Sequence, residues 1–400
     1  MESIFVYRDP DPAGSSSDSG PLTGLNIAIQ PNVSVAGWPT EAGSRALENF
    51  TALEDATIIG RLREAGAALC GSTRMSEFGF GLDGSRAGAA LKENAADAEI
   101  VLDLMGESRI AAGHADVCGF KPSYGLVSVL GLVGLIPSME CWGLLSANIS
   151  RIREILDTIA GPDPLDFSLP DDPAPDFFAR EVVPENTRIG IVSEAADELP
   201  AEGKSAFDGS VNELKKAGFL VRELSFADMA LFSLVHSIVG SVEASSSAGR
   251  YDSVRYGRRE PGAKNWNEMY LRSRGAAFGT LVKSYLFQGA YFQFERYAAY
   301  EDACRIRARL VADMEKLFDQ ADFLVFPAAG GSGKESSLAG TYEQFSATLF
   351  ANVTGQPVLY LPPAPGSKAG GFQLAGPRLS DAGVLALGGH FLNLRQGGCL

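Results

Sequence analysis

A short segment of the sequence brings together four side chains that could carry out acid–base or nucleophilic chemistry. Glu107, Ser108, His114 and Asp116 lie within ten residues of one another. A serine hydroxyl becomes a nucleophile when a histidine removes its proton and a carboxylate orients that histidine. The segment could therefore form a hydrolase site with Ser108 as the nucleophile. The alternative is a loop whose polar side chains face solvent or cap a helix.

The stretches around this segment alternate between helix and strand patterns. The stretch from Ala89 to Asp103 is typical of a helix followed by a strand, and apolar residues at helical spacing from Ile149 predict another helix. Arg188 to Val192 predicts a strand, and Ser205 to Ala217 predicts a helix after it. This repeated order favours an α/β fold, with helices on both faces of a sheet.

The composition limits the class of protein. The chain has 400 residues, of which 46% are hydrophobic, so it can bury a large core. Its net charge is −15, which argues against direct binding of nucleic acid phosphates by the chain alone. We expect no membrane span, because no continuous apolar run approaches the roughly 20 residues that one needs. The first residues also lack the pattern of a signal peptide.

The cysteines and histidines indicate neither disulfides nor a metal site. The five cysteines, which are odd in number and widely spaced without a CxxC pair, are Cys70, Cys118, Cys141, Cys304 and Cys399. We interpret them as reduced thiols, which predicts a cytoplasmic protein. No cluster of His, Cys and Asp has metal-ligand spacing, and we expect no metal or other cofactor.

The N-terminal residues predict a division of the chain. Ser3 to Tyr7 could form a short strand, and a stretch rich in Asp, Pro, Gly and Ser follows it. Such a composition is typical of a flexible linker. The sequence therefore predicts a strand and linker over residues 1–21 and a single large domain over residues 22–400.

Three stretches of the chain resemble segments of the amidase-signature family. CGFKPSYGLVS (residues 118–128) is similar to the family's C-G-x-K-P-T-Y-G-R-V-S, and LREAGAALCGSTRMSEFGFG (residues 62–81) matches another family block. EASSSAGRYDSVRYGRRE (residues 243–260) resembles the segment that distinguishes the A subunit of the tRNA-dependent amidotransferases. The resemblance implies a twisted, mixed β-sheet with helices on both faces.

The same resemblance implies a catalytic lysine that this chain lacks. Family members use a triad of a nucleophilic serine, a second serine with a cis peptide bond, and a lysine base from a K-D-N motif. Here the motif is replaced by Gln30-Pro31-Asn32. A glutamine amide has no useful basicity near neutral pH, so Gln30 cannot take over the role of the base.

The two serines of the triad are also not recognisable. The region 82–117, where the family has its glycine-rich serine loops, is shortened, and Gly84-Ser85 is the remnant that could supply the relay serine. Counting back from Cys118 places Ile110 at the nucleophile position. Ser108 reaches that position only after a shift of two residues, and no glycine pair flanks it to form an oxyanion pocket.

The substrate-binding residues implied by the resemblance are altered as well. The two arginines of the family's K-R-R-I-M-L-G segment are absent from residues 283–289, and Glu343 is displaced from the position of their acidic partner. A basic cluster remains, which could form a charged surface or a contact with another protein. It consists of Arg250, Arg255, Arg258 and Arg259.

These observations leave three hypotheses open. They also leave open whether the chain is an enzyme. The first is an inactive pseudoenzyme, similar to the A subunit of the amidotransferases, that binds a partner or a ligand; the expected partners are subunits B and C of an amidotransferase or another protein. The second is an active amidase or amidotransferase subunit with a rebuilt site containing Ser108 and Ser85. The third is a faulty gene model, but that would remove one block and would not also replace the lysine and the arginines.

Overall fold

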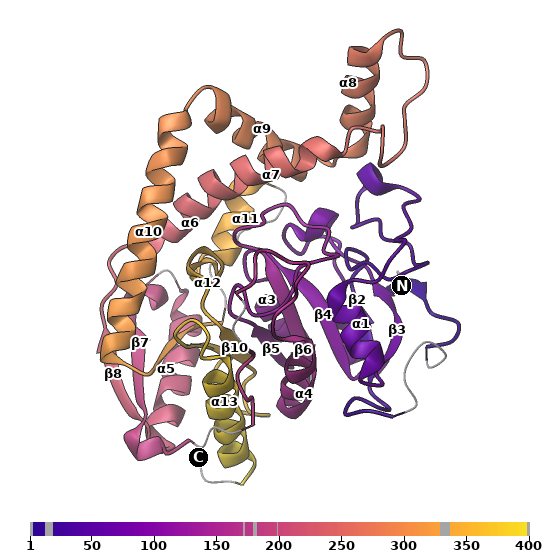
Figure 1. Cartoon of the computed structure of the whole chain (residues 1–400). Helices are drawn as coiled ribbons and strands as arrows, with labels where there is room; N and C mark the ends of the chain where they lie inside the picture. Colours follow the sequence, from indigo (N-terminus) through magenta and orange to yellow (C-terminus); the bar gives the residue numbers. More distant parts are fainter. Residues whose placement is uncertain are drawn as a thin grey trace.

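The computed structural model describes residues 3–12, 19–170, 173–178, 182–197, 199–328 and 337–397. Its centre is one sheet of eleven strands with helices packed around it (Figure 1). The strands are β1 (Phe5–Arg8), β2 (Asn26–Ile29), β3 (Ala68–Thr73), β4 (Ala98–Asp103), β5 (Cys118–Lys121), β6 (Cys141–Ser146), β7 (Arg188–Val192), β8 (Leu220–Leu224), β9 (Phe323–Pro327), β10 (Val358–Leu361) and β11 (Phe372–Ala375).

The α-helices largely alternate with the strands up to β8, and five of them then follow in succession before β9. They are α1 (Thr57–Glu64), α2 (Ala89–Lys92), α3 (Glu107–Ala115), α4 (Ile149–Ile159), α5 (Ala201–Lys216), α6 (Met229–Val235), α7 (Ser241–Ser247), α8 (Trp266–Ala277), α9 (Thr280–Phe294), α10 (Tyr297–Gln320), α11 (Leu338–Phe345), α12 (Leu349–Thr354) and α13 (Asp381–Gln396). The helix expected from Ile149 is present as α4, and the Asn148 side chain caps it by accepting from the backbone N–H of Ser150 at 2.9 Å.

The sheet is mixed, as the sequence predicted. Its strand order is β1-β3-β2-β4-β6-β5-β10-β11-β9-β7-β8. Strands β3, β2 and β4 run parallel at one end, and β9, β7 and β8 run parallel at the other. The strands between these two groups pair antiparallel. The two parallel groups are therefore joined through an antiparallel centre.

Helices cover both faces of this sheet, which confirms the expected layers. Along β9, Phe323 and Val325 pack into one hydrophobic core, whereas Leu324 and Phe326 pack into another. This alternation is what a strand buried on both faces requires. Residues of α1, α4 and α13 complete the first core, and residues of α6, α10 and α12 complete the second.

The N-terminal strand belongs to the sheet. β1 pairs antiparallel with β3, with Phe5 opposite Thr73 and Arg8 opposite Gly71. Residues 13–18 of the expected linker lie outside the described residues, so that expectation stays a prediction. The four cysteines that the structure describes are all free thiols, and Cys399 lies outside the described part of the chain.

One continuous helical stretch is longer and more apolar than the sequence patterns suggested. It runs from Met229 to Arg250 through α6, a π-helical turn at His236–Gly240 and α7. By length and composition it could cross a membrane, but 44% of its most apolar window is buried inside the fold. Its π-helical turn packs against α9 and α10, and a core helix of a folded protein passes the same test.

Candidate functional site

A tight turn connects β4 to α3 and carries the polar centre of the molecule. The strand ends at Asp103, the turn comprises Leu104, Met105 and Gly106, and the helix begins at Glu107. Gly106 has φ of 126°, and a Cβ atom there would lie 2.3 Å from the Thr348 side chain. Only glycine fits this conformation and this contact. The turn is therefore held in a shape that aims its backbone N–H groups inward.

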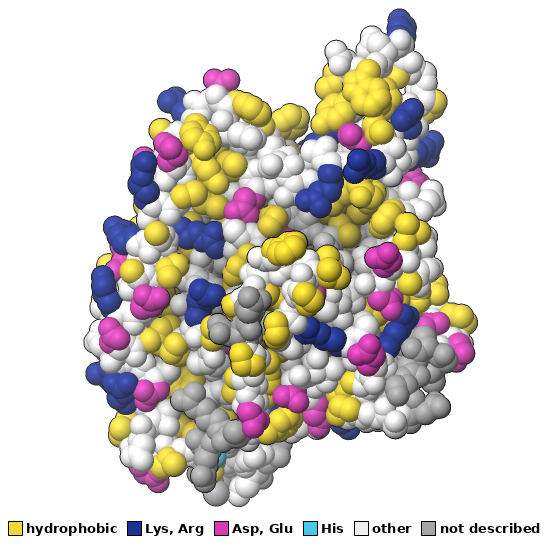
Figure 2. Space-filling model, in the orientation of Figure 1, with side chains coloured by type: hydrophobic (Ala, Val, Ile, Leu, Met, Phe, Trp, Pro, Cys, Tyr) yellow, Lys and Arg dark blue, Asp and Glu magenta, His cyan; other side chains and the backbone are white. Residues whose placement is uncertain are grey.

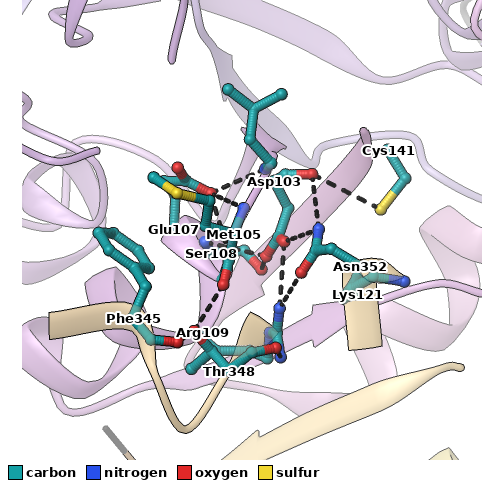
Figure 3. A network of polar contacts seen from close by, with 12 residues as sticks. Asp103, Met105, Glu107, Ser108, Arg109, Lys121, Cys141, Phe345, Thr348 and Asn352 are labelled. Atoms are coloured by element: carbon teal, nitrogen blue, oxygen red, sulfur yellow. Dashed lines mark hydrogen bonds and ion pairs between the residues drawn. The ribbon is translucent and has the colours of Figure 1, made fainter. Parts of the chain in front are cut away.

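The carboxylate of Glu107 fills the space enclosed by this turn. Its Oε2 accepts hydrogen bonds from the backbone N–H groups of Leu104 (2.7 Å), Met105 (2.7 Å) and Gly106 (3.1 Å). Its Oε1 accepts from the backbone N–H of Gly81 at 3.2 Å. Converging backbone N–H groups at a helix start form an anion-binding nest. Here the nest binds a side chain of the same helix (Figure 3).

The protonation of Glu107 is set by opposing effects. Burial and the negative charge of Asp103 raise the pKa of Glu107 to about 8, while the backbone N–H groups act in the other direction. The side chain is only 3% exposed. Near neutral pH this carboxyl group is therefore protonated to a much larger extent than an exposed glutamate.

Asp103 is the second buried acid of the network, and it is an ion-pair partner. Its Oδ1 accepts from Arg109 Nη2 (3.2 Å) and Asn352 Nδ2 (2.8 Å), and its Oδ2 accepts from the backbone N–H and the hydroxyl of Ser108. Burial raises the pKa of Asp103, but Arg109 and the Ser108 hydroxyl outweigh it and hold the pKa below its usual range. Asp103 is thus the ionised member of the pair of acids, and Figure 3 shows its contacts with Ser108, Arg109 and Asn352.

Arg109 links this turn to the C-terminal part of the chain. Its Nη1 donates to the backbone oxygen of Thr348 (2.8 Å) and to Gln373 Oε1 (2.9 Å), and its Nη2 also donates to Asn352 Oδ1 (2.7 Å). The side chains of Arg109 and Asp103 are both 0% exposed. The hydrogen bonds of this buried guanidinium hold its acceptors at Thr348, Asn352 and Gln373 in defined positions.

A buried histidine holds the outer side of the turn. His236 Nε2 lies 3.0 Å from the backbone oxygen of Leu104, and its Nδ1 lies 2.8 Å from the hydroxyl of Tyr342. Because a carbonyl oxygen can only accept, Nε2 carries the proton and Nδ1 accepts from the tyrosine. Burial lowers the pKa of His236 to about 4, so the ring is neutral. His236 thus holds the carbonyl group of Leu104 in place, and the N–H of the same residue belongs to the nest.

Gln30, at the position of the family lysine, lies close to this centre. It follows β2, it is 4% exposed, and its Oε1 accepts from the backbone N–H of Leu102 at 2.9 Å. Lys121 is a buried lysine nearby, and its Nζ donates to the backbone oxygens of Pro122 (2.9 Å) and Gln356 (3.0 Å). Both side chains are thus engaged with backbone groups, and neither set of hydrogen bonds supplies a general base.

The structure separates the other residues that the sequence singled out. Ser108 is 0% exposed and donates to Asp103, whereas His114 and Asp116 are exposed at the far end of α3. The structure therefore does not bring Ser108 together with His114 and Asp116. Residues 107–115 form a mostly buried helix and not a loop, although His114 and Asp116 do face solvent.

Ser85 does not meet Gln30 or Ser108 in the described part of the chain. It is partly exposed, its hydroxyl accepts from the backbone N–H of Ala87 at 3.2 Å, and its own N–H donates to Leu82. Its neighbour Gly84 lines a cleft of about 660 Å³ next to the ends of β2 and β3, together with Pro31 and Ser76. Ligands of α/β proteins often bind beyond the carboxyl ends of parallel strands.

Sequence reasoning missed the central residues of this network, although a signal was present. In the amidase-signature family the nucleophilic serine lies in a G-G-S-I-R segment, which can be aligned with Met105 to Arg109, with its second glycine on Gly106 and its arginine on Arg109. In that register Glu107, and not Ile110, stands in the place of the serine. Among the described residues, no group of three or more His, Cys, Asp or Glu is arranged to hold a metal ion.

The chain matches a family model described as Amidase over residues 9–102 and 103–385. The chain belongs to the amidase family. The A subunit of the glutamyl-tRNA(Gln) amidotransferase of Natronomonas pharaonis is 32% identical over 406 aligned positions, which cover 93% of this chain and 96% of that protein. The corresponding protein of Carboxydothermus hydrogenoformans is 30% identical over 407 positions, covering 94% and 84%.

Solved structures of amidase-family proteins share the fold. The crystal structure of the A subunit of glutamyl-tRNA(Gln) amidotransferase from Thermotoga maritima has a TM-score of 0.77 at 21% identity, and the match covers 96% of this chain and 86% of that one. Peptide amidase from Stenotrophomonas maltophilia has a TM-score of 0.79 at 21% identity, with coverage of 98% and 89%. The resemblance seen in the sequence is thereby confirmed at the level of family and fold.

The buried acids predict an unusual dependence of stability on pH. Burial raises the pKa of Glu99 and Glu140 to about 7, and that of Glu107 to about 8. A raised pKa means that the folded state binds more protons than the unfolded chain between the usual glutamate pKa and the raised one. The free energy of unfolding should therefore fall as the pH rises from about 5 to about 8, by up to roughly 1.4 kcal/mol per pH unit for each extra proton bound.

Urea titrations across this pH range will measure the effect. Glu99, whose carboxylate accepts from the Thr73 hydroxyl (2.6 Å) and the Gly88 N–H (2.7 Å), offers a test by Glu99→Gln. That variant should flatten the pH dependence, because it removes one of the titrating groups. A parent protein whose stability is constant or rises between these pH values would contradict the prediction.

Proposed function

We propose that this amidase-family protein does not hydrolyse amides with the family triad and acts instead as a partner- or ligand-binding subunit. The observation that carries the proposal is the Glu107 carboxyl group in the backbone nest before α3. Such a nest is the kind of site that stabilises a developing oxyanion. A substrate oxygen would have to displace the Glu107 carboxyl group, whose oxygens already accept from four backbone N–H groups.

Gln30 supports the same proposal from the other side of the site. Its amide oxygen is used in a hydrogen bond to the Leu102 backbone, and an amide cannot take a proton from a serine near neutral pH. Ser85, the candidate relay serine, makes no comparable contact among the described residues. Its hydroxyl instead accepts from a backbone N–H of its own loop. Base, relay and oxyanion site are thus all altered together.

An active amidase with a rebuilt site is the competing proposal. It requires a nucleophile that solvent can reach, and Ser108 is fully buried against Asp103. A substrate could reach Ser108 only after the surrounding side chains moved. The cleft beside Gly84 is also lined by Ser76, whose hydroxyl donates to the backbone oxygen of Gly81 at 2.7 Å.

Activity assays on purified protein test the proposal. With glutamine and with a simple amide, turnover should not exceed background, while an active amidase-family enzyme serves as the positive control. Gln30→Lys should also remain inactive, because members of a triad act as a unit and the relay serine is missing. A Gln30→Lys variant with turnover well above the parent would overturn the proposal. Turnover in the parent that Ser108→Ala abolishes would establish the rebuilt site instead.

The partner part of the proposal is supported by what the relatives are. The amidotransferase proteins of Natronomonas pharaonis and Carboxydothermus hydrogenoformans are each one subunit of a larger enzyme. We infer that this chain binds other polypeptides, with amidotransferase subunits B and C as the first candidates, in the cytoplasm. Co-expression with these two proteins followed by size-exclusion chromatography tests the point. Separate elution of all three chains would count against it.

A further inference from the structure

Helix α9 carries an apolar surface that the fold does not cover. Its inner face is buried through Val282, Tyr285, Leu286 and Gly289. On its outer face lie three aromatic residues, Phe287, Tyr291 and Phe294, which are 74%, 48% and 76% exposed. They are spaced four and three residues apart, so they form one stripe along the helix, here called the aromatic stripe.

α9 packs its apolar inner face against the body of the protein and exposes the aromatic stripe on its outer face, beside polar residues such as Ser284. Exposed large aromatic side chains that adjoin one another mark interaction surfaces, since they are the residues that contribute most to protein–protein binding. The aromatic stripe therefore has the composition of an interaction surface, and the described part of the fold leaves it uncovered.

A groove continues the aromatic stripe toward α8. It measures about 260 Å³ and is lined by apolar residues that include Leu271, Phe278 and Phe287, with Arg274 and Lys283 beside them. None of the described residues that line it is Asp or Glu. Arg274 donates to the backbone oxygens of Ala248 and Tyr251, and Lys283 Nζ donates to that of Gly275, so both cations are held in place beside the groove.

The charge around the groove differs in sign from that of the chain as a whole. Residues 250–296 contain nine Lys or Arg and four Asp or Glu, a net charge of +5, whereas the chain carries −15. The end of this segment that holds α8 projects from the body of the molecule (Figure 1). Figure 2 shows hydrophobic side chains on that projection with Lys and Arg around them. The complementary surface is apolar and acidic.

This charge also decides between a second copy of the chain and a different polypeptide. A symmetric dimer through the aromatic stripe would bring two segments of charge +5 together. Like charges across an interface oppose association. The stripe and groove instead have the form of a site for an amphipathic helix, with anchors at successive turns and cations at the edge.

We propose that the aromatic stripe and the adjoining groove bind an amphipathic helix of another polypeptide, whose polar side carries Asp and Glu. The inference deepens the proposed partner-binding role, and it rests on that role. The aromatic anchors of this binding surface would be Phe287 and Phe294, and its charged contacts would be Arg274 and Lys283. Loss of enzymatic activity is not part of it, so assays of amide hydrolysis test the proposed function separately.

A pair of synthetic peptides tests the chemistry of the partner. Both peptides form a helix with leucines on one face, and the other face carries only Glu in one peptide and only Lys in the second. In fluorescence anisotropy with the full-length protein, the acidic peptide should bind at least about tenfold more tightly than the basic one, and its affinity should fall with added salt. Equal affinities for the two peptides would overturn the proposal.

Variants locate the binding surface. The double change Phe287→Ser and Phe294→Ser should weaken binding of the acidic peptide by about tenfold or more, because both anchors are lost. Phe167→Ser is the matched control: Phe167 is 97% exposed and lies outside the aromatic stripe, so its loss should leave the affinity unchanged. Both variants change exposed residues, and circular dichroism will confirm that they fold. Unchanged binding by the double variant would overturn the proposal.

Photo-crosslinking identifies the natural occupant in cells. A photoreactive phenylalanine analogue at position 287 should capture a segment of another polypeptide that is both acidic and apolar, whereas the same analogue at position 167 should not capture that segment. Capture of a second copy of this chain at position 287, of a basic segment, or of no protein at all would each overturn the proposal.

Discussion

Glu107→Ala is expected to reduce the free energy of unfolding by about 3 kcal/mol or more, since each buried N–H group left without an acceptor costs roughly 1–3 kcal/mol. Four such groups, those of Gly81, Leu104, Met105 and Gly106, lose their acceptor in this variant. Water entering the space would recover part of the loss. Chemical denaturation monitored by intrinsic fluorescence measures the change.

Glu107→Gln is the matched control for this effect. Its single carbonyl oxygen can take the place of Oε2 and accept from the three turn N–H groups, but its amide group then faces the Gly81 N–H, which is another donor. We therefore expect a loss of about 1 kcal/mol, well below that of the alanine variant. Equal stability of Glu107→Ala and the parent would show that the nest does not need its carboxylate.

Arg109→Met should be about as damaging, with an expected loss of about 3–5 kcal/mol, which is typical when one partner of a buried ion pair is removed. The methionine fills much of the volume but leaves Asp103 without its cation, and it also deprives Thr348, Asn352 and Gln373 of a donor. The variant should be measured at neutral pH by urea denaturation.

The pH dependence separates a charge effect from a packing effect. The depressed pKa of Asp103 contributes stability that is present above the usual aspartate pKa and is lost as the pH falls. Without Arg109 that contribution is smaller, so the deficit of Arg109→Met should shrink in acid. A deficit that is independent of pH would point to packing alone. The exposed pair Arg151–Glu154 is the control, and Arg151→Met should cost less than about 1 kcal/mol.

Local patterns were sufficient for much of the fold. The strand expected at Arg188 to Val192 forms as β7, and the unit expected at Ala89 to Asp103 forms as α2 and β4, because apolar spacing and turn residues determine such elements locally. The order of the strands could not be found in this way. Pairing of β5 with β10 joins Lys121 to Val358, which are far apart in the sequence, and that contact depends on the tertiary fold alone.

The site was harder to predict for a related reason. Glu107 and Arg109 look like ordinary polar residues at a helix start, and their partners Thr348, Asn352 and Gln373 lie in remote parts of the sequence. Burial makes these residues important, and burial is not visible in a short window of sequence. The proximity of Ser108 to His114 was misleading, because a helix places residues six positions apart on different faces.

The position of β10 and β11 has a consequence for the biosynthesis of the protein. These strands come from residues 358–375, yet they lie in the middle of the sheet, between β5 and β9. Before residues 358–375 are synthesised, the preceding strands can pair only as two separate groups, β1 to β6 and β7 to β9, each with an unpaired inner edge. The Arg109 guanidinium also lacks two of its hydrogen-bond acceptors until Asn352 and Gln373 have been synthesised. Completion of the central sheet therefore requires residues 358–375, and a chain truncated before residue 358 would expose two unpaired edges that favour aggregation.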